Sequence, residues 1–558
     1  NDAPMKRTEP SFPSLPLEAW LVGVIVVAIA LRFLLLTRHE LWYDEALSIL
    51  LSSGQKLSYK APEAIPVALK EYGQLLRIPA EQGLGDIIET FKNILKGILG
   101  DAHPPLFYLG QHMWMRIFGA GIAAQRSLVV LTSIGTIGCG YGLGRLVLGN
   151  RGGLILAALL ATNPFFLAHS LNLRMYALLT FWAVLSQWLL LLLLDYGDER
   201  KLPLRPVGVG LAIAVAGGLL TQYLYAYCLI SLGIALLVLG RKHWLRCGSA
   251  LGAGILLAIP WVLWGTRQQA NNRADVLTQI SVEGSPVTIA FRHFQDIAHT
   301  LANHLLLGHW TTGFRPYEES IKPTAVTVGI GVIIFLAFVL WQLRKEKRIL
   351  VTGVVLGLVP LAIALGLDIL TNKFTVGFGW GRSTIVALPG CLLLITSWLM
   401  TLQRWQQPVI AGVLSLYFVM GVGSFVGRDR NIFRTLDTLI EPDQNTLIAV
   451  NSEAWGNVSR LAYHIDGTEK PVDMLMLSPA ELANALEKAV DNGSYDRILL
   501  VNTRYPVWDT PKTDDEATDF FRADQAALEP DYDLTDDIFL PGTMKIDRFE
   551  IRAYRYNP

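Results

Sequence analysis

Residues 17–46 are LEAWLVGVIVVAIALRFLLLTRHELWYDEA. The apolar run that begins this stretch is about 20 residues long, the length an α-helix needs to cross the hydrocarbon core of a membrane. It is longer than the apolar core of a signal peptide, and no small-residue cleavage site follows it. We therefore interpret residues 17–37 as a retained first membrane span, followed directly by an aromatic pair and two adjacent carboxylates.

Similar apolar runs recur along most of the chain. Of its 558 residues, 52% are hydrophobic and 17% are charged, whereas a soluble domain carries about 25% charged residues. The sequence predicts a polytopic α-helical membrane domain over residues 17–427, with about eleven spans. The expected spans are 17–37, 127–148, 153–169, 176–194, 206–222, 224–240, 247–265, 324–343, 349–369, 384–401 and 408–427.

One further apolar run, 104–118, carries His112 and Arg116 and is short for a span. If it does not cross, the short basic loops, such as the run 344–348, all face the cytoplasm with the N-terminus, as the positive-inside rule requires. We therefore predict an amphipathic helix in the outer interface. Large loops at 38–126 and 266–323 then lie outside.

The remainder, 428–558, has a different composition. It carries 14 basic and 25 acidic residues, and this charge asymmetry favours a soluble domain on the same outer side. Alternating strand-like and helix-like segments predict a small extracytoplasmic α/β domain. No clustered basic face indicates a nucleic-acid partner. The expected strands are 446–450, 472–476, 497–502 and 549–556, and the expected helices are 452–463, 478–490 (with Ser478 as N-cap) and 514–528.

Two adjacent carboxylates, Asp44 and Glu45, follow the first span beside Trp42 and Tyr43. Carboxylates near the membrane are costly to bury, so such groups are candidates for function. The alternative interpretation is a solvated interfacial turn with an aromatic anchor.

A second element is Asp101-Ala102-His103-Pro104-Pro105. Two prolines begin a helix well but do not fit inside one. We therefore expect a stiff start to the helix at 104–118, with His103 at its N-cap. The alternative is that this element only caps the helix.

Several cations are expected on the outer side, against the positive-inside bias, so each needs a carboxylate or a phosphate as partner. Arginine binds phosphate bidentately, and lysine binds it as a point charge. The histidines of the loop 266–323 fit no common metal spacing, and we expect them to be solvated or interfacial. The candidate cations are Arg126, Arg174, Lys373 and Arg382, and the histidines are His293, His299, His304 and His309.

Together these motifs resemble the GT-C membrane glycosyltransferases, in particular the protein O-mannosyltransferases and the lipid A aminoarabinose transferases. Asp44-Glu45 is similar to the family's Asp-Glu motif, and His103-Pro104-Pro105-Leu106 is similar to the mannosyltransferase motif. The aminoarabinose transferases have a lysine before the two prolines, so this chain departs from them there. The resemblance covers roughly residues 17–270.

The resemblance implies a polyprenyl-phosphate-linked sugar as donor and a site at the outer membrane face. Asp44 would be the general base, with its pKa raised by burial or by the like charge of Glu45 beside it. Glu45 would alternatively bind a cation. The leaving phosphate needs positive charge rather than a general acid, and a single displacement would invert the anomeric centre. For His103, contact with the phosphate or a divalent metal site with Asp101 and Asp44 remain open. The expected phosphate-binding residues are His103, Arg126, Arg174, Tyr176, Lys373 and Arg382.

Two other functions remain as alternatives. A flippase or transporter of a lipid-linked sugar would favour charges in the middle of the spans, whereas here they gather at the outer rim. A non-catalytic cell-envelope assembly factor would not need Asp44. We expect membrane lipids as surroundings, a lipid, protein or polysaccharide as acceptor, and a bacterial inner membrane with the site on the periplasmic side.

Overall fold

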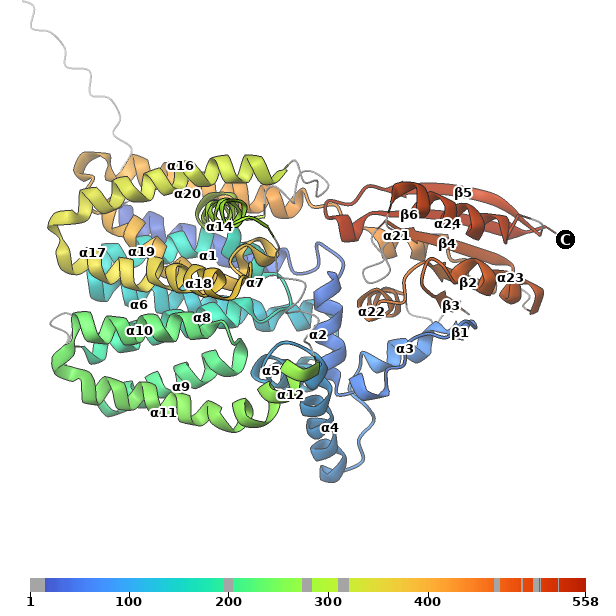
Figure 1. Cartoon of the computed structure of the whole chain (residues 1–558), viewed down its shortest axis with the longest axis horizontal. Coiled ribbons are helices and arrows are strands. Elements are labelled where there is room, and N and C mark those ends of the chain that lie inside the picture. Colours follow the sequence, from blue (N-terminus) through green and yellow to red (C-terminus); the bar gives the residue numbers. More distant parts are fainter. Residues whose placement is uncertain are drawn as a thin grey trace, which may run out of the picture.

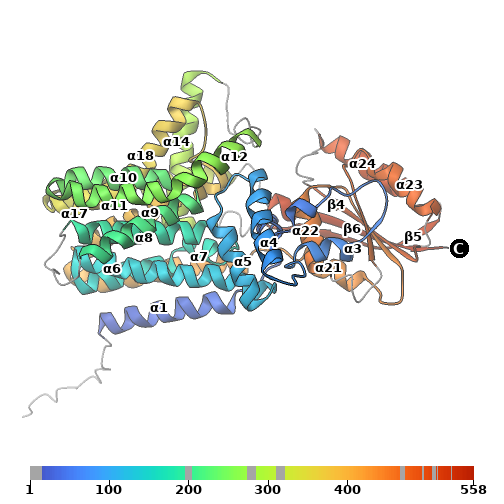
Figure 2. The ribbon, with the colours of Figure 1, turned by 90° about the horizontal axis from the view of Figure 1, so that it is seen from below.

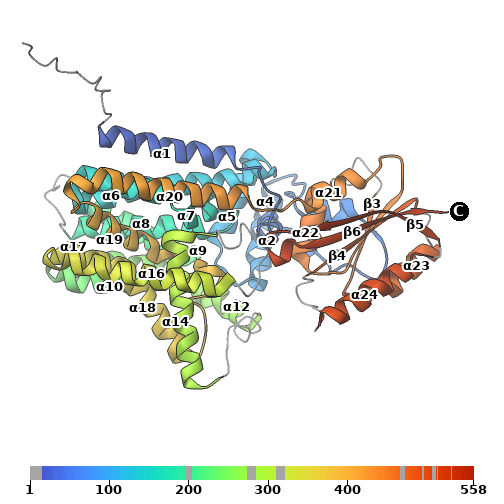
Figure 3. The same ribbon diagram turned by 90° about the horizontal axis from the view of Figure 1, so that it is seen from above.

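The computed structural model describes a helical bundle at one end and an α/β domain at the other (Figure 1). Helices run nearly parallel along the bundle, and a layer of shorter helices separates it from the sheet. Figures 2 and 3 show the same three-part division after quarter turns in either direction. The described residues are 16–194, 204–272, 284–309, 321–465, 472–492, 495–504, 511, 513–529 and 531–557.

The bundle confirms the polytopic membrane protein. Within the described ranges, nine helices are long and apolar enough to cross a membrane, and α10 is a shorter apolar helix. Because one of the nine holds two of the expected spans, these helices account for all eleven. The bundle helices are α1 (Leu17–Leu34), α6 (Ile122–Thr162), α7 (Pro164–Ser170), α8 (Tyr176–Leu193), α9 (Leu204–Thr221), α10 (Tyr225–Leu239), α11 (Trp244–Trp261), α16 (Ile321–Gln342), α17 (Lys347–Gly353), α18 (Val359–Thr371), α19 (Leu388–Leu399) and α20 (Gln406–Val426).

Helix α6 is a hairpin of two antiparallel limbs. The backbone leaves the helical region at Gly149, with φ of 78°, a conformation that glycine adopts without steric cost. The limbs then approach closely, because a Cβ on Gly144 would lie 2.9 Å from the Cα of Gly153. Small residues allow such backbone contact between membrane helices.

A layer of short helices lies at the end of the bundle that faces the sheet (Figure 1). The predicted non-crossing helix is α5, whose 13 residues span only about 20 Å. Helix α17, which follows the basic run 344–348, lies at the opposite end of the bundle (Figure 3). The helices of this layer and of the second large loop are α2 (Tyr43–Ser53), α3 (Leu69–Leu75), α4 (Leu84–Gly97), α5 (Leu106–Phe118), α12 (Arg267–Asn272) and α14 (Pro286–Ala302).

The α/β domain is built on one six-stranded sheet in the order β1-β3-β2-β4-β6-β5. Strands β2, β3 and β4 are parallel, while β1, β5 and β6 pair antiparallel. All four predicted strands are present. The domain contains α21 (Ile432–Leu439), β2 (Thr446–Val450), α22 (Trp455–His464), β3 (Val472–Met476), α23 (Leu482–Asn492), β4 (Arg497–Thr503), α24 (Asp514–Ala526), β5 (Tyr532–Leu540) and β6 (Phe549–Tyr556), with β1 (Val67–Ala68).

Three features of the domain differ from the sequence prediction. Strand β1 comes from the first large loop and was not predicted, because a two-residue strand carries no periodic signal. Strand β5 was also missed. Helix α23 begins at Leu482 rather than after Ser478, whose hydroxyl instead donates to the Glu481 carboxylate.

Buried carboxylates attach this domain to the bundle. Glu40 accepts hydrogen bonds from the backbone N–H groups of Ile432 and Arg434, and so caps the start of α21. Asp547 is fully buried and bonds Arg430 and Arg460, each at 2.8 Å. Arg460 in turn donates to the Leu41 carbonyl, between α1 and α2. The α/β domain is therefore held against the segment that carries the Asp-Glu motif.

Replacing Asp547 with Asn should loosen this attachment. The substitution leaves two buried guanidinium groups without their carboxylate, a loss of about 3–5 kcal/mol. Hydrogen–deuterium exchange of the α21 amides should therefore become faster. Asp537→Asn is the control, since Asp537 is half-exposed and pairs with Arg552 at the surface. Unchanged exchange in Asp547→Asn would contradict this account of the attachment.

Candidate active site

The Glu45 carboxylate is completely enclosed. It forms a two-pronged ion pair with Arg126, with both N–O distances at 2.8 Å, and only 1% of Glu45 is exposed. It also accepts the backbone N–H groups of Trp42 and Leu173. Arg126 is equally occupied, since it donates to backbone carbonyls between α1 and α2. The expected phosphate contact of Arg126 is therefore not supported, because its donors already have internal partners.

Asp44 is the neighbouring residue, but its side chain meets different groups. Its Oδ2 accepts a hydrogen bond from Arg382 Nη1 at 2.9 Å and lies 3.9 Å from Arg174 Nε. Arg174 also donates to the Asp44 carbonyl and to the Ser48 hydroxyl. The side chain of Asp44 is 18% exposed, so a substrate can reach it. The structure thus separates the two adjacent carboxylates into one that is accessible and one that is sealed.

The electrostatics of Asp44 differ from the sequence prediction. Burial acts to raise its pKa, but the charges of Arg382 and Arg174 outweigh burial and hold the pKa below its ordinary value of 3.8. The predicted increase through Glu45 is wrong, because Arg126 neutralises Glu45 and lowers its pKa as well. Asp44 is therefore ionised at neutral pH and can accept a hydrogen bond from a hydroxyl group.

Arg382 is held in place by aromatic rings. Its guanidinium lies 5.4 Å from the ring of Trp42, 5.5 Å from that of Tyr176 and 5.4 Å from that of Phe378. Cations prefer such positions over ring faces. The turn before it contains Trp380 at a φ of 61°, between two glycines that also have positive φ. This turn places Arg382 next to Tyr176 of α8 and Asp44 of α2.

One residue and the backbone conformation of one turn in the same cluster were not recognised from the sequence. Ser48 lies one turn of α2 after Asp44 and holds Arg174, and nothing in the pattern marked it. The Gly379-Trp380-Gly381 turn carries a signal that was not used, since closely spaced glycines often mark positive φ. Lys373, by contrast, lies earlier in this outer turn, where its N–H bonds to Asp368 O. None of the contacts described for Asp44 involves it.

Asp101 and His103 are in contact with each other. His103 Nδ1 lies 2.9 Å from Asp101 Oδ2, which also accepts the hydroxyl of Tyr108. Burial opposes ionisation of Asp101, but His103 and Arg174 outweigh it and lower its pKa. Among the described residues, no three histidine, cysteine or acidic side chains converge to hold a metal ion. Asp101 Oδ2 is already shared by His103 and Tyr108, and Asp44, Asp101 and His103 do not converge as the suggested metal site requires.

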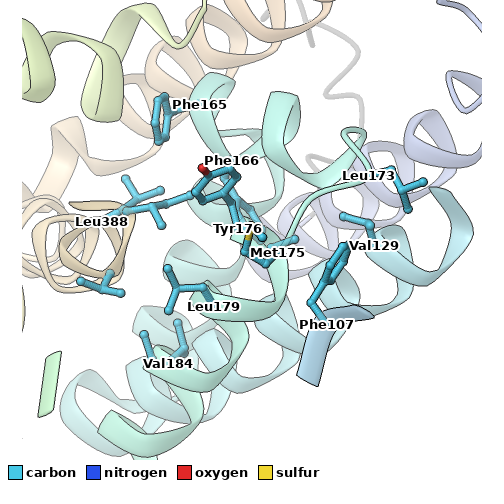
Figure 4. Packing of buried hydrophobic residues seen from close by; sticks show 14 of the residues in the cluster. Phe107, Val129, Phe165, Phe166, Leu173, Met175, Tyr176, Leu179, Val184 and Leu388 are labelled. Carbon is cyan, nitrogen blue, oxygen red and sulfur yellow. The ribbon is translucent and has the colours of Figure 1, made fainter. Parts of the chain in front are cut away.

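Arg174 is also one of the residues that line an apolar groove. The groove has a volume of about 180 Å³ and lies between α5, α6 and α8. Phe107 and Val129, two of its lining residues, lie side by side in Figure 4. Arg174 therefore contacts Asp44 and also lines the apolar groove. The other lining residues are Leu106, Gly110, Leu128, Thr132, Leu178 and Trp182.

Comparison with known proteins agrees with this layout. Residues 102–264 match the sequence model of the dolichyl-phosphate-mannose-protein mannosyltransferase family. ArnT from Cupriavidus metallidurans in its apo state is similar over 96% of this chain and 98% of that chain, with 13% identity and a TM-score of 0.54. The chain has the GT-C fold. The same enzyme bound to undecaprenyl phosphate gives 14% identity and a TM-score of 0.52 over the same shares.

The predicted resemblance to the GT-C glycosyltransferases and the predicted fold class are thus confirmed. The matched segment begins just before the His-Pro-Pro element and includes Arg126, Arg174 and Tyr176. No curated protein sequence matches the chain significantly. This GT-C chain is an integral membrane protein with its Asp-Glu motif between the bundle and the α/β domain.

Glu45→Gln should destabilise this GT-C protein strongly. It would leave Arg126 charged and buried without its carboxylate, which costs about 3–5 kcal/mol. The midpoint of thermal unfolding in detergent should fall clearly below that of the wild type. Glu18→Gln is the matched control: its pair with Arg151, at 2.7 Å, is partly exposed, and such surface pairs contribute little to stability. Equal unfolding midpoints for the two variants would show that Glu45 does not organise this region.

Proposed function

We propose that the protein transfers a sugar from a polyprenyl-phosphate-linked donor to an acceptor hydroxyl at the outer membrane face. The observation that carries this proposal is the position of Arg174. Its guanidinium lies 3.9 Å from the Asp44 carboxylate, and the same residue lines the apolar groove. A lipid chain in this groove would bring its phosphate to the arginine, and the sugar on that phosphate to Asp44.

The groove suits a polyprenyl chain because its lining is almost entirely apolar. The phosphate would bind Arg174, whose Nε is buried and has no hydrogen-bond partner in the described part of the chain. His103 lies close enough to Asp44 to lower its pKa, and we assign it to the same phosphate. ArnT, which shares this fold, has been crystallised with undecaprenyl phosphate, in line with this class of donor.

In the proposed reaction, Asp44 accepts the proton of the acceptor hydroxyl as its oxygen attacks the anomeric carbon. The bond from this carbon to the phosphate oxygen breaks, and the electron pair leaves with the polyprenyl phosphate. Arg174 and Arg382 stabilise the charge that develops on the leaving group. This single displacement inverts the anomeric centre. Glu45 does not take part in the proton transfer, and its role is to hold Asp44 in position.

Donor binding would also adjust the basicity of Asp44. In the free protein, two guanidinium groups lower its pKa. A bound phosphate competes for the same groups, and its own negative charge disfavours a second anion beside it. Asp44 therefore becomes a stronger base when the donor is present, so the site is activated by its own substrate.

Asp44→Asn should abolish transfer, because an amide does not accept the hydroxyl proton. A lost general base costs about 10²–10⁴-fold in rate. Lipids extracted from purified wild-type and variant protein are compared by mass spectrometry, and sugar-loaded polyprenyl phosphate should be enriched in the variant. The mass of that lipid names the donor sugar.

Retained transfer in Asp44→Asn would count against catalysis at this residue. No polyprenyl lipid in either protein, together with retained envelope function in the variant, would favour the flippase or the assembly factor. Loss of transfer with accumulation of the donor excludes both alternatives.

Gly110→Leu should weaken donor binding without unfolding the protein. Gly110 lines the groove, and a Cβ at this position would meet no atom within 4 Å, so the leucine side chain fills the space meant for lipid. Less polyprenyl phosphate should copurify, and KM for the donor should rise about tenfold or more, since each displaced methylene is worth about 0.8 kcal/mol and the leucine side chain displaces about two of them. Gly138→Leu, equally open on α6 but outside the groove, is the control and should behave as wild type.

A further inference from the structure

Arg382 also lines a second cavity, which is small and is bordered by aromatic and basic side chains. The cavity has a volume of about 20 Å³ and lies where the bundle, the outer turn and the α/β domain meet. It is separate from the lipid groove, with which it shares no lining residue. Its lining residues are Trp42, Ala168, His169, Asn172, His309, Trp380, Arg382, Arg428 and Met544.

Polar atoms without partners are concentrated around this cavity. Trp42 Nε1, Arg382 Nε and Arg428 Nε are buried donors that have no hydrogen-bond partner in the described structure. His169 is only 3% exposed, and its Nδ1 is also unpartnered. Buried polar atoms in native proteins nearly always have partners. One unpartnered atom of the lining, Asn172 Oδ1, is an acceptor. The unpaired donors outnumber it, which indicates a ligand that mainly accepts hydrogen bonds.

The charge of the lining indicates an anionic ligand. Two guanidinium groups, from Arg382 and Arg428, face the cavity, and its lining contains no carboxylate. Burial lowers the pKa of Arg428 to about 10, which still leaves it charged at neutral pH. Burial, with the charges of Arg428 and Arg382, also keeps His309 neutral by lowering its pKa. Arg382 already pairs with Asp44, whereas Arg428 has no ion-pair partner in the described part of the chain. A buried cation without a paired anion is costly, so an anion in the cavity would stabilise Arg428.

Size narrows the choice of anion. A cavity needs only about 10–15 Å³ of this volume to hold one water molecule, so the space admits a small group but not a whole sugar ring. Arginine binds both carboxylate and phosphate through two parallel hydrogen bonds. A carboxylate is the smaller of the two groups and is planar, so the small volume of the cavity favours a carboxylate over a tetrahedral phosphate.

We infer that this cavity binds the carboxylate group of an acidic sugar while the rest of that sugar lies toward Asp44. The proposed function is needed only to say which molecule carries the carboxylate, the donor or the acceptor. That the cavity binds an anion is inferred from its lining residues alone. Because Arg382 touches both Asp44 and the cavity, a bound carboxylate would hold the sugar at a fixed distance from the base.

The test uses the full-length protein in lipid nanodiscs, with thermal unfolding measured against glucuronate, glucose and inorganic phosphate at equal ionic strength. Glucuronate should raise the unfolding midpoint, and glucose should not. In Arg428→Gln the apparent affinity for glucuronate should fall about tenfold or more, because a charge-assisted hydrogen bond is lost. Arg548→Gln is the matched control, since Arg548 bonds only a carbonyl at the surface, and it should retain the shift.

Trp42→Phe provides a second variant, because it removes the unpaired N–H and keeps an aromatic ring beside Arg382. It should also weaken the glucuronate shift. No shift with glucuronate in the wild type, or an equal shift in Arg428→Gln, would overturn the inference. A shift with phosphate alone would also overturn the assignment of a carboxylate.

Asp44→Asn separates this inference from the proposed function. It should keep the glucuronate shift, since no cation of the cavity is removed, even though transfer is lost. If the variant keeps transfer as well, the proposed function fails and the anion site stands. The lipid that accumulates in this variant identifies the source: a uronic acid on the lipid means a donor-borne carboxylate, and a neutral sugar means an acceptor-borne one.

Discussion

The buried ion pair between Glu45 and Arg126 is the constraint on which the site depends. It joins the start of α2 to the start of α6 across 81 residues, and its remaining acceptor capacity binds the N–H of Leu173 near Arg174. A buried carboxylate must be paired and hydrogen-bonded to be tolerated, and four donor atoms meet this need. Because Glu45 is fixed, the position of the preceding residue, Asp44, is fixed as well. That position lies between Arg174 and Arg382.

The same segment also connects the bundle to the α/β domain. Glu40 caps α21, and the Leu41 carbonyl accepts from Arg460. A short stretch after the first span therefore binds both halves of the molecule, with Asp44 at its end. This arrangement places the candidate base beneath the α/β domain and beside two cavities of opposite character. One is apolar and has Arg174 in its lining, and the other has the two cations Arg382 and Arg428 in its lining.

Hydropathy predicted the bundle well because a membrane span is a local, one-dimensional signal. The Asp-Glu motif and the outer cations were also visible locally. Which carboxylate pairs with which cation was not visible in the sequence, because these pairs form between residues far apart in the chain. Asp44 and Arg382, for example, are 338 residues apart. Arg126 was therefore assigned to phosphate although it serves Glu45. The four histidines of the second loop were expected to be solvated or interfacial, yet each is at most 8% exposed, since helical packing buries them and sequence spacing alone does not show it.

We propose that Asp44 is the titrating base and that its two arginines set its pKa. The most direct test is the pH dependence of kcat/KM in wild type and Arg382→Gln. In the wild type, Asp44 stays ionised down to below pH 3.8, so this group does not limit the rate at higher pH. Removing Arg382 leaves burial to raise the pKa, and the acidic limb of the profile should move to higher pH. An acidic limb that stays in place would contradict the claim that Asp44 accepts the proton.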